Sequence, residues 1–164
     1  MTADTAARPI PSTAADPAHF LSQSGIKRLE SIVHGQEAHS PMLQILGVKI
    51  HAWSDGHVEL RAVPQARFHN FMNTVHGGWA LTLLDTSMGL ASLTTLLPGE
   101  FAPTLETTAK FVRPIVAGVG ELRILGDVVS RGRRVVTLDG RVEDATGKLY
   151  AHGTSSCLIS AWRG

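Results

Sequence analysis

The distribution of apolar positions along the chain predicts a helix, two strands, a long helix and four further strands. Residues 18–35 place apolar side chains roughly on one face, which predicts the first helix with Gly35 as its C-cap. Runs rich in Leu, Ile and Val, separated by turn residues, predict the strands. These runs cover residues 42–53, 57–63, 104–112, 121–130, 134–143 and 148–160.

The segment from Gly77 to Leu97 is the most apolar part of the chain and predicts one long helix. It opens on a glycine pair and ends before Pro98-Gly99. Apolar residues occupy most of its circumference, which predicts burial nearly all round. The order of elements therefore predicts an α+β fold, in which an antiparallel sheet of about five to six strands wraps around one long central helix, with an additional N-terminal helix.

The first 18 residues differ from the rest of the chain. Pro9, Pro11 and Pro17 punctuate a polar stretch, so we expect residues 1–18 to form a flexible tail. This stretch lacks the apolar core of a secretory signal. Residues 19–164 are long enough to form a single domain with its own core.

Composition and charge exclude several classes of function. Charged residues make up 18% of the chain and the net charge is +1, so bulk electrostatics indicates neither a nucleic-acid partner nor a membrane surface. Asp85, near the middle of the apolar segment, favours a buried helix over a membrane span. The single cysteine, Cys157, excludes an intrachain disulfide and favours a buried, inert thiol. Because neither a secretory signal nor a membrane span is expected, we expect a cytoplasmic protein. The eight histidines show no metal-ligand spacing, so we expect no metal site.

The most informative segment begins at Asn70 and runs through His76-Gly77-Gly78 to Asp85. A glycine pair at a helix start lets a ligand approach the backbone. The first amides of a helix lack intrahelical acceptors and lie at the positive end of its dipole. The N–H of Gly77 is therefore a candidate donor to a carbonyl oxygen that becomes negative during acyl transfer.

Asp85 is the candidate reacting carboxylate. It lies eight residues beyond Gly77, or about 12 Å along the helix axis, too far to serve the same carbonyl within one chain. If both residues act in one reaction, a two-fold pairing of antiparallel helices must bring them together from two copies. The pattern alone also allows a structural interpretation, namely a tight turn at His76-Gly77-Gly78 and an aspartate satisfied by Thr82 or Thr86.

These residues resemble the phenylacetic-acid-degradation (PaaI-like) branch of the hotdog-fold acyl-CoA thioesterase superfamily. In that pattern an Asn precedes His-Gly-Gly by six positions and an Asp follows the His by nine, as Asn70, His76 and Asp85 do. The similarity extends over roughly residues 25–160. Further matching segments are Ile45-Leu46-Gly47-Val48, Phe111-Val112-Arg113-Pro114 and residues 129–135.

The resemblance implies hydrolysis of an acyl or aryl-acyl thioester to a carboxylic acid and coenzyme A. It implies that the Gly77 N–H polarises the thioester carbonyl, that His76 and Asn70 shape the pocket, and that Asp85 of the partner subunit acts as general base or nucleophile. Thr104 corresponds to a family serine or threonine that holds the water. The family implies a homo-oligomer, either a dimer or a dimer of dimers (a homotetramer), with no cofactor apart from the coenzyme A of the substrate.

One glycine and four arginines are candidates for contacts with coenzyme A. The arginines are chosen because a guanidinium group can form paired hydrogen bonds with a phosphate. For each arginine taken singly, the pattern favours an ordinary surface residue over such a contact. The candidates are Gly78, Arg113, Arg131, Arg133 and Arg134. Two alternative functions remain open: a hotdog enzyme acting on an acyl-carrier-protein thioester, and a non-catalytic acyl-CoA-binding protein.

Overall fold

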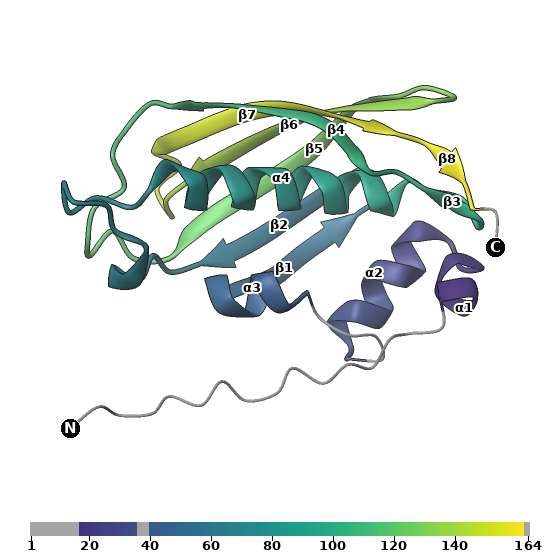
Figure 1. Ribbon diagram of the computed structural model, residues 1–164, viewed down its shortest axis with the longest axis horizontal. Helices are drawn as coiled ribbons and strands as arrows, with labels where there is room; N and C mark the ends of the chain where they lie inside the picture. The colour runs from purple at the N-terminus through teal and green to yellow at the C-terminus, as the bar shows by residue number, and fades with distance from the viewer. Residues whose placement is uncertain (1–16, 36–39, 163–164) are drawn as a thin grey trace.

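The computed structural model describes residues 17–35 and 40–162 and has an α+β architecture (Figure 1). Six strands form one antiparallel sheet in the order β1-β2-β5-β6-β7-β4, and two short strands pair separately. The predicted sheet of five to six strands around one long helix is confirmed. The elements are α1 (Pro17–Leu21), α2 (Gly25–Val33), α3 (Pro41–Leu46), β1 (Val48–Ser54), β2 (His57–Ala62), the 3-10 helix η1 (Ala66–Phe68), α4 (Gly77–Thr94), β3 (Glu100–Phe101), β4 (Thr104–Phe111), β5 (Leu122–Arg131), β6 (Val135–Glu143), β7 (Leu149–Leu158) and β8 (Ser160–Ala161).

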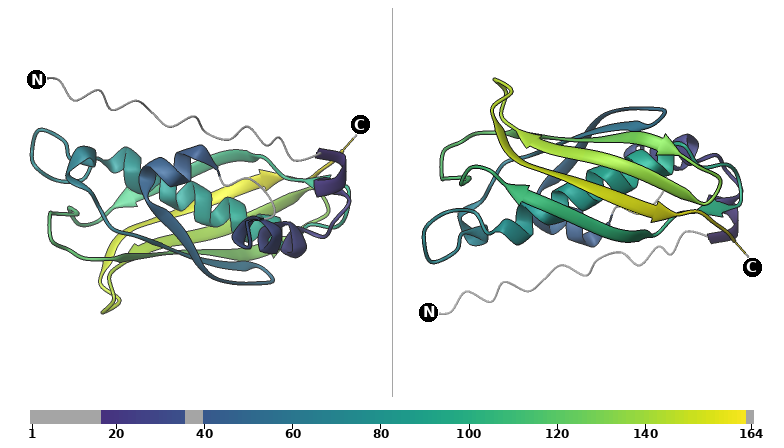
Figure 2. Two further views of the ribbon diagram at one scale, coloured as in Figure 1. Left: turned by 90° about the horizontal axis from the view of Figure 1, so that it is seen from below. Right: turned by 90° about the horizontal axis from the view of Figure 1, so that it is seen from above.

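The sheet curves around α4, and α2 and α3 lie on the opposite side of this helix from β6 and β7 (Figures 1 and 2). Three glycines in register, Gly126, Gly140 and Gly153, form a row across β5, β6 and β7. A Cβ at Gly126 would lie 2.4 Å from the backbone carbonyl of Ser87, and one at Gly140 would lie 3.1 Å from the side chain of Met88. The two glycines directly beneath α4 therefore let it approach the sheet closely.

The helix α4 is not buried on every side in the described chain. Its sheet-facing side is buried, including Leu83, Leu84 and Met88, which are all 0% exposed. A stripe on the other side, which includes Asp85 and Leu90, is only half-buried. The prediction of burial nearly all round is thus only partly confirmed, and the half-buried stripe is available to another surface.

The N-terminal elements differ from the prediction. The single helix expected over residues 18–35 is divided into α1 and α2, which are separated at residues 22–24. The buried guanidinium of Arg28 donates hydrogen bonds to the carbonyls of Gln23 (2.9 Å), Leu97 (2.9 Å) and Glu100 (2.7 Å). These bonds tie the break between α1 and α2 to the segment that follows α4 and to β3 (Glu100–Phe101). The tail predicted over residues 1–18 lies outside the described residues except for its last two, which begin α1.

The strand predicted over residues 42–53 is wrong in its first half. Pro41 begins the short helix α3, because a proline is tolerated in the first turn. Gly47 ends this helix in the left-handed conformation with φ 69°. The segment Ile45-Leu46-Gly47-Val48 is therefore a helix end followed by a strand start, and β1 begins only at Val48. The other five predicted strands are confirmed within a few residues, although β8 is separate from β7.

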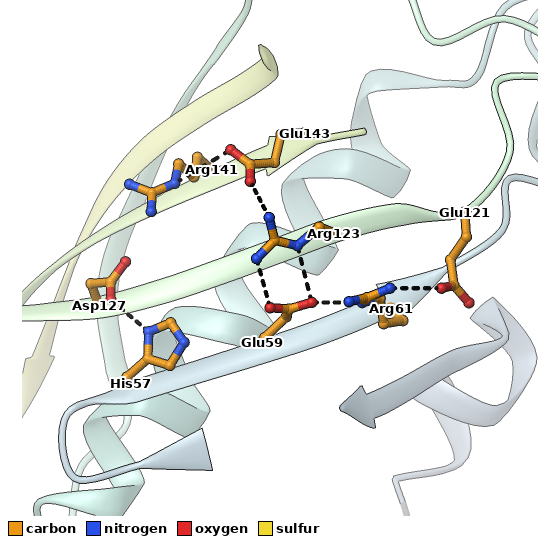
Figure 3. A network of polar contacts seen from close by, with 8 residues as sticks. All are labelled: His57, Glu59, Arg61, Glu121, Arg123, Asp127, Arg141 and Glu143. Carbon is orange, nitrogen blue, oxygen red and sulfur yellow. Dashed lines mark hydrogen bonds and ion pairs between the residues drawn. The ribbon is translucent and has the colours of Figure 1, made fainter. Parts of the chain in front are cut away.

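The outer face of the sheet carries a network of ion pairs (Figure 3). The carboxylate of Glu59 accepts hydrogen bonds from Arg61 (2.6 Å) and from Arg123 (2.8 and 3.1 Å). Arg123 also binds Glu143 at 2.9 Å, and Arg61 binds Glu121 at 3.1 Å. The hydrogen bonds from Arg123, supported by those from Arg61, lower the pKa of the Glu59 carboxyl to about 2.

The described residues were also compared with what a membrane span and a metal site require. Within residues 17–35 and 40–162, no helix combines the length and hydropathy needed to cross a membrane. The same residues contain no group of three or more His, Cys, Asp or Glu side chains arranged to hold a metal ion.

Candidate functional site

The start of α4 presents a free backbone amide. His76 is the N-cap, and its Nδ1 accepts a hydrogen bond from the N–H of Gly78 at 3.3 Å. The described residues provide no acceptor for the N–H of Gly77. A Cβ at Gly77 would lie 3.2 Å from the ring of Phe111, so the glycine lets this ring pack against the helix start. The Gly77 amide thus combines an unused donor with the positive end of an 18-residue helix.

Asn70 organises the loop that leads into this helix. Its side-chain oxygen accepts hydrogen bonds from the backbone amides of Met72 (2.9 Å) and Thr74 (3.3 Å), and its Nδ2 donates to Thr74 Oγ1 at 3.0 Å. The loop also contains Asn73 at φ 59°, a conformation that asparagine tolerates well. In the described chain Asn70 therefore shapes the approach to His76 through the backbone.

Two hollows flank the start of α4. One, of about 270 Å³, is lined by Gly77, Phe111 and Arg113 among others. The other, of about 440 Å³, is lined by His76, Gly78 and several apolar side chains. The predicted pocket residues are therefore divided between two sides of the helix start, with Gly77 facing one hollow and its neighbours the other.

Asp85 lies on the half-buried stripe of α4, and its partner comes from β4. Thr107 Oγ1 donates a hydrogen bond to Asp85 Oδ1 at 2.8 Å. The alternative partners considered from the sequence, Thr82 and Thr86, instead donate to helix carbonyls one turn earlier, at 2.9 and 2.8 Å. Sequence reasoning missed Thr107. The available signal was a hydroxyl at a position of β4 that the two-residue period turns toward the helix.

Thr104, the candidate site residue that was predicted on β4, shares a hollow of about 270 Å³ with Asp85. Its Oγ1 lies 4.0 Å from the sulfur of Cys157. Burial raises the pKa of the Cys157 thiol, which disfavours the reactive thiolate. The expected burial of Cys157 is confirmed, and its inertness stays a prediction.

Gly77 and Asp85 occupy one uninterrupted helix and are separated by about two turns, or about 12 Å of axis. Within the chain, Asp85 shares a hollow with Thr104, whereas Gly77 shares one with Arg113. The two candidate groups therefore line separate hollows of the described chain.

The candidate arginines lie at both ends of α4. Arg113, beside Gly77, donates to the carbonyl of Leu149 at 2.6 Å. Arg131 lies at the C-terminal end of the helix, where it donates to the carbonyl of Thr95 (3.1 Å) and pairs with Glu100 (2.6 Å). Arg133 and Arg134 are exposed in the adjoining turn between β5 and β6. Of these four arginines, Arg113 is the one that lines the hollow described above beside Gly77.

Residues 72–151 match the model of the thioesterase superfamily. This range includes His76, Gly77, Gly78, Asp85 and Thr104. No curated protein matches the chain. Together with the six-stranded sheet around α4, the match confirms the resemblance seen in the sequence. The chain has the hotdog fold, and its residues 72–151 are similar to the thioesterase superfamily.

Solved structures support the same placement. A phenylacetic acid degradation-related protein from Ralstonia eutropha JMP134 is 29% identical, with 79% of this chain and 97% of that chain covered and a TM-score of 0.73. A Streptococcus mutans UA159 protein bound to acetyl CoA is 25% identical over 71% of this chain and 91% of its own, with a TM-score of 0.64. The PaaI protein from the E. coli phenylacetic acid degradation operon shares the fold, at 21% identity over 88% of this chain and 97% of its own (TM-score 0.72).

Proposed function

We propose that the chain is an acyl-CoA thioesterase that hydrolyses an acyl or aryl-acyl thioester at a site shared between two copies. The Gly77 N–H of one copy donates to the thioester oxygen, and Asp85 of the other copy acts as general base or nucleophile. One observation carries the proposal: a free helix-start amide and a half-buried carboxylate lie about two turns apart on the same helix. The acetyl CoA bound by the similar streptococcal protein supports the substrate class.

The edge strand β4 supplies a route to the shared site. It is the last strand of the sheet, so it has paired backbone groups on one side only within the described chain. Phe111, at its C-terminal end, packs near Gly77, and Thr104, at its N-terminal end, shares the hollow with Asp85. Antiparallel pairing of two β4 strands about a two-fold axis would set the Thr104 end of one copy beside the Phe111 end of the other. The Asp85 carboxylate of one copy would thereby approach the Gly77 amide of its partner.

The side chains at this edge favour such a pairing. Leu105 and Phe111 on β4 are 58% and 54% exposed, and Met42 on α3 is 54% exposed. Burying exposed apolar area against a second copy stabilises a dimer by roughly 25 cal/mol per Å² of apolar surface. The half-buried stripe of α4 would be covered by the same association.

The chemistry requires few groups. As a general base, Asp85 takes a proton from water while the hydroxyl adds to the thioester carbon. The Gly77 N–H stabilises the oxyanion of the resulting tetrahedral intermediate. When this intermediate collapses, the C–S bond breaks and coenzyme A leaves as a thiolate, which takes up a proton. As a nucleophile, Asp85 instead forms an acyl anhydride that water opens. A thiolate is a good leaving group, so no second acid is needed.

The remaining candidates take supporting roles in this proposal. His76 and Asn70 fix the shape of the helix start, and Thr104 holds the attacking water. The groups proposed to contact coenzyme A are Gly78, Arg113, Arg131, Arg133 and Arg134. Since the last three lie at the far end of α4 from Gly77, they would reach a substrate bound at the partner's helix start.

A mixing experiment with two inactive variants tests the shared site. Asp85→Asn removes the base, and Gly77→Pro removes the amide. Proline suits the first helical position, and His76 already has the extended conformation (φ −62°, ψ 134°) that precedes a proline. Each variant alone should lose acyl-CoA hydrolysis. After co-refolding, mixed dimers contain one intact site, so about a quarter of wild-type activity should return.

The control and the opposing outcomes are distinct. Gly77→Ala retains the N–H while making the same Cβ contact with Phe111, so it should keep more activity than Gly77→Pro. If mixing restores nothing, the site is not shared in this way. If wild-type protein binds acyl-CoA without hydrolysing it, the chain is a binding protein, and if only acyl-carrier-protein thioesters are cleaved, the substrate class is wrong.

A further inference from the structure

A pair of hydroxyl groups lies beneath Asp85, between α4 and the strands β4 and β7. Thr107 Oγ1 donates to Asp85 Oδ1 at 2.8 Å and lies 3.1 Å from Ser155 Oγ. Ser155 is 5% exposed, and its Oγ lies 2.8 Å from the backbone carbonyl oxygen of Glu106, which can accept its proton. We infer that Thr107 is a positioning residue for Asp85, fixing one carboxylate oxygen so that the other one reacts. This inference rests on the proposed function.

The proton positions in this pair follow from the donors available. An ionised carboxylate can only accept, so the single O–H of Thr107 is directed to Asp85. The proton of Ser155 then goes to the carbonyl of Glu106 or to Thr107 Oγ1, both of which are within reach. Either arrangement leaves the Thr107 hydrogen on Asp85, so the hydroxyl pair orients one carboxylate oxygen.

The second oxygen of Asp85 is available for chemistry. Within residues 17–35 and 40–162, no hydrogen bond to Asp85 Oδ2 is found. The hollow beside Asp85, lined also by Gly89, Leu90 and Thr104, gives space next to the carboxylate. A carboxylate held at Oδ1 and free at Oδ2 retains an unused lone pair for water or for the thioester carbon.

Two variants of Thr107 test this role by kinetics. Thr107→Val keeps the branched shape and removes the donor. A hydrogen bond to a charged group is worth enough to change a rate about 10-fold or more, so kcat should fall by that factor while KM stays within about twofold. Thr107→Ser restores the hydroxyl and should recover most of kcat. If Thr107 acted only through packing, kcat would fall in Thr107→Ser, which loses the methyl group, and would stay unchanged in Thr107→Val, which loses the hydroxyl.

The matched control is the neighbouring residue on the same strand. Thr108 Oγ1 lies 3.0 Å from Thr154 Oγ1 on the exposed, outer face of the sheet. Thr108→Val therefore makes the same chemical change without touching Asp85, and its kcat should equal that of the wild type. If Thr107→Val lowers the yield of folded protein, Thr107→Ala removes the same hydroxyl without adding bulk.

The outcomes separate this inference from the function on which it rests. Wild type and Asp85→Asn are assayed beside the Thr107 variants on the same acyl-CoA. If Asp85→Asn abolishes hydrolysis and Thr107→Val leaves kcat unchanged, the inference is overturned and the function stands. If Asp85→Asn hydrolyses as fast as wild type, the proposed function and this inference fall together. A loss in Thr107→Val that Thr107→Ser does not repair also overturns it.

Discussion

Glu59 and Asp85 are two carboxylates on opposite faces of one sheet, and their surroundings differ. Glu59, on the outer face, is 7% exposed and accepts hydrogen bonds from two guanidinium groups. Asp85, on the helix that lies in the concave face, is half-buried and accepts one hydrogen bond from a neutral hydroxyl. The Glu59 carboxylate is paired with two arginines and stabilises the fold. The Asp85 carboxylate has no charged partner among the described residues, so it can interact with a substrate or with water. We therefore expect substitutions at these positions to separate stability from activity.

The largest expected effect is on activity at Asp85. Asp85→Asn should lower kcat for acyl-CoA hydrolysis by about 10²–10⁴-fold, since it removes the general base or nucleophile. Its free energy of unfolding should change by less than about 1 kcal/mol, because the asparagine oxygen still accepts from Thr107. Hydrolysis assays and urea denaturation of the same preparations check both values. If Asp85→Asn instead lowers the free energy of unfolding strongly, Asp85 stabilises the fold as Glu59 does, and the expected difference between the two carboxylates is contradicted.

The next effect is on stability at Glu59. Glu59→Gln should lower the free energy of unfolding by about 1–3 kcal/mol, because Arg61 and Arg123 would face a neutral amide at a site with little solvent. Its kcat should stay close to that of wild type. Glu121→Gln is the control: this side chain is 45% exposed, so the expected loss is below about 0.5 kcal/mol.

The pH dependence of stability sharpens the same contrast. The pKa of Glu59 in the folded chain is about 2, below its ordinary value of 4.5. Its contribution is therefore complete above about pH 4.5 and is lost as the pH falls toward about 2. The difference in unfolding free energy between wild type and Glu59→Gln should be constant from pH 7 to about 5 and shrink below that. A difference that grows in acid would contradict this account.

The smallest expected effect concerns Arg131. Arg131→Gln removes a cation near the C-terminal end of α4 and its pair with Glu100, so stability should fall by about 0.3–1 kcal/mol. If Arg131 also contacts coenzyme A on the partner, KM should rise in the same variant. Thermal melts and steady-state kinetics measure the two effects separately.

The sequence predicted more of the fold than of the site. Periodicity located α4 and most strands, since a long apolar helix and alternating strands leave strong local patterns. It failed at α3, because Leu and Ile suit helices and strands alike and the decisive Pro41 and Gly47 act only at the ends. It also failed to divide α1 from α2, where the bonds from buried Arg28 join segments far apart in the chain.

Within the site, local sequence indicated the positions that depend on a helix start. Gly77 lies at the first turn of α4, with its amide free of acceptors in the described chain. The partner of Asp85 was missed because Thr107 is 22 residues away and reaches it only through the packing of β4 against α4. Contacts of this kind depend on tertiary structure and leave no local spacing pattern in the sequence.

The row of glycines across the sheet limits how this sequence can diverge. A side chain at Gly126 would meet the backbone of Ser87 and lift the helix, two residues beyond Asp85. Asp85 would then move relative to Thr107, although neither residue had changed. A homologue could thus keep every polar group of the site and still have drifted out of working geometry through one added methyl group on a neighbouring strand.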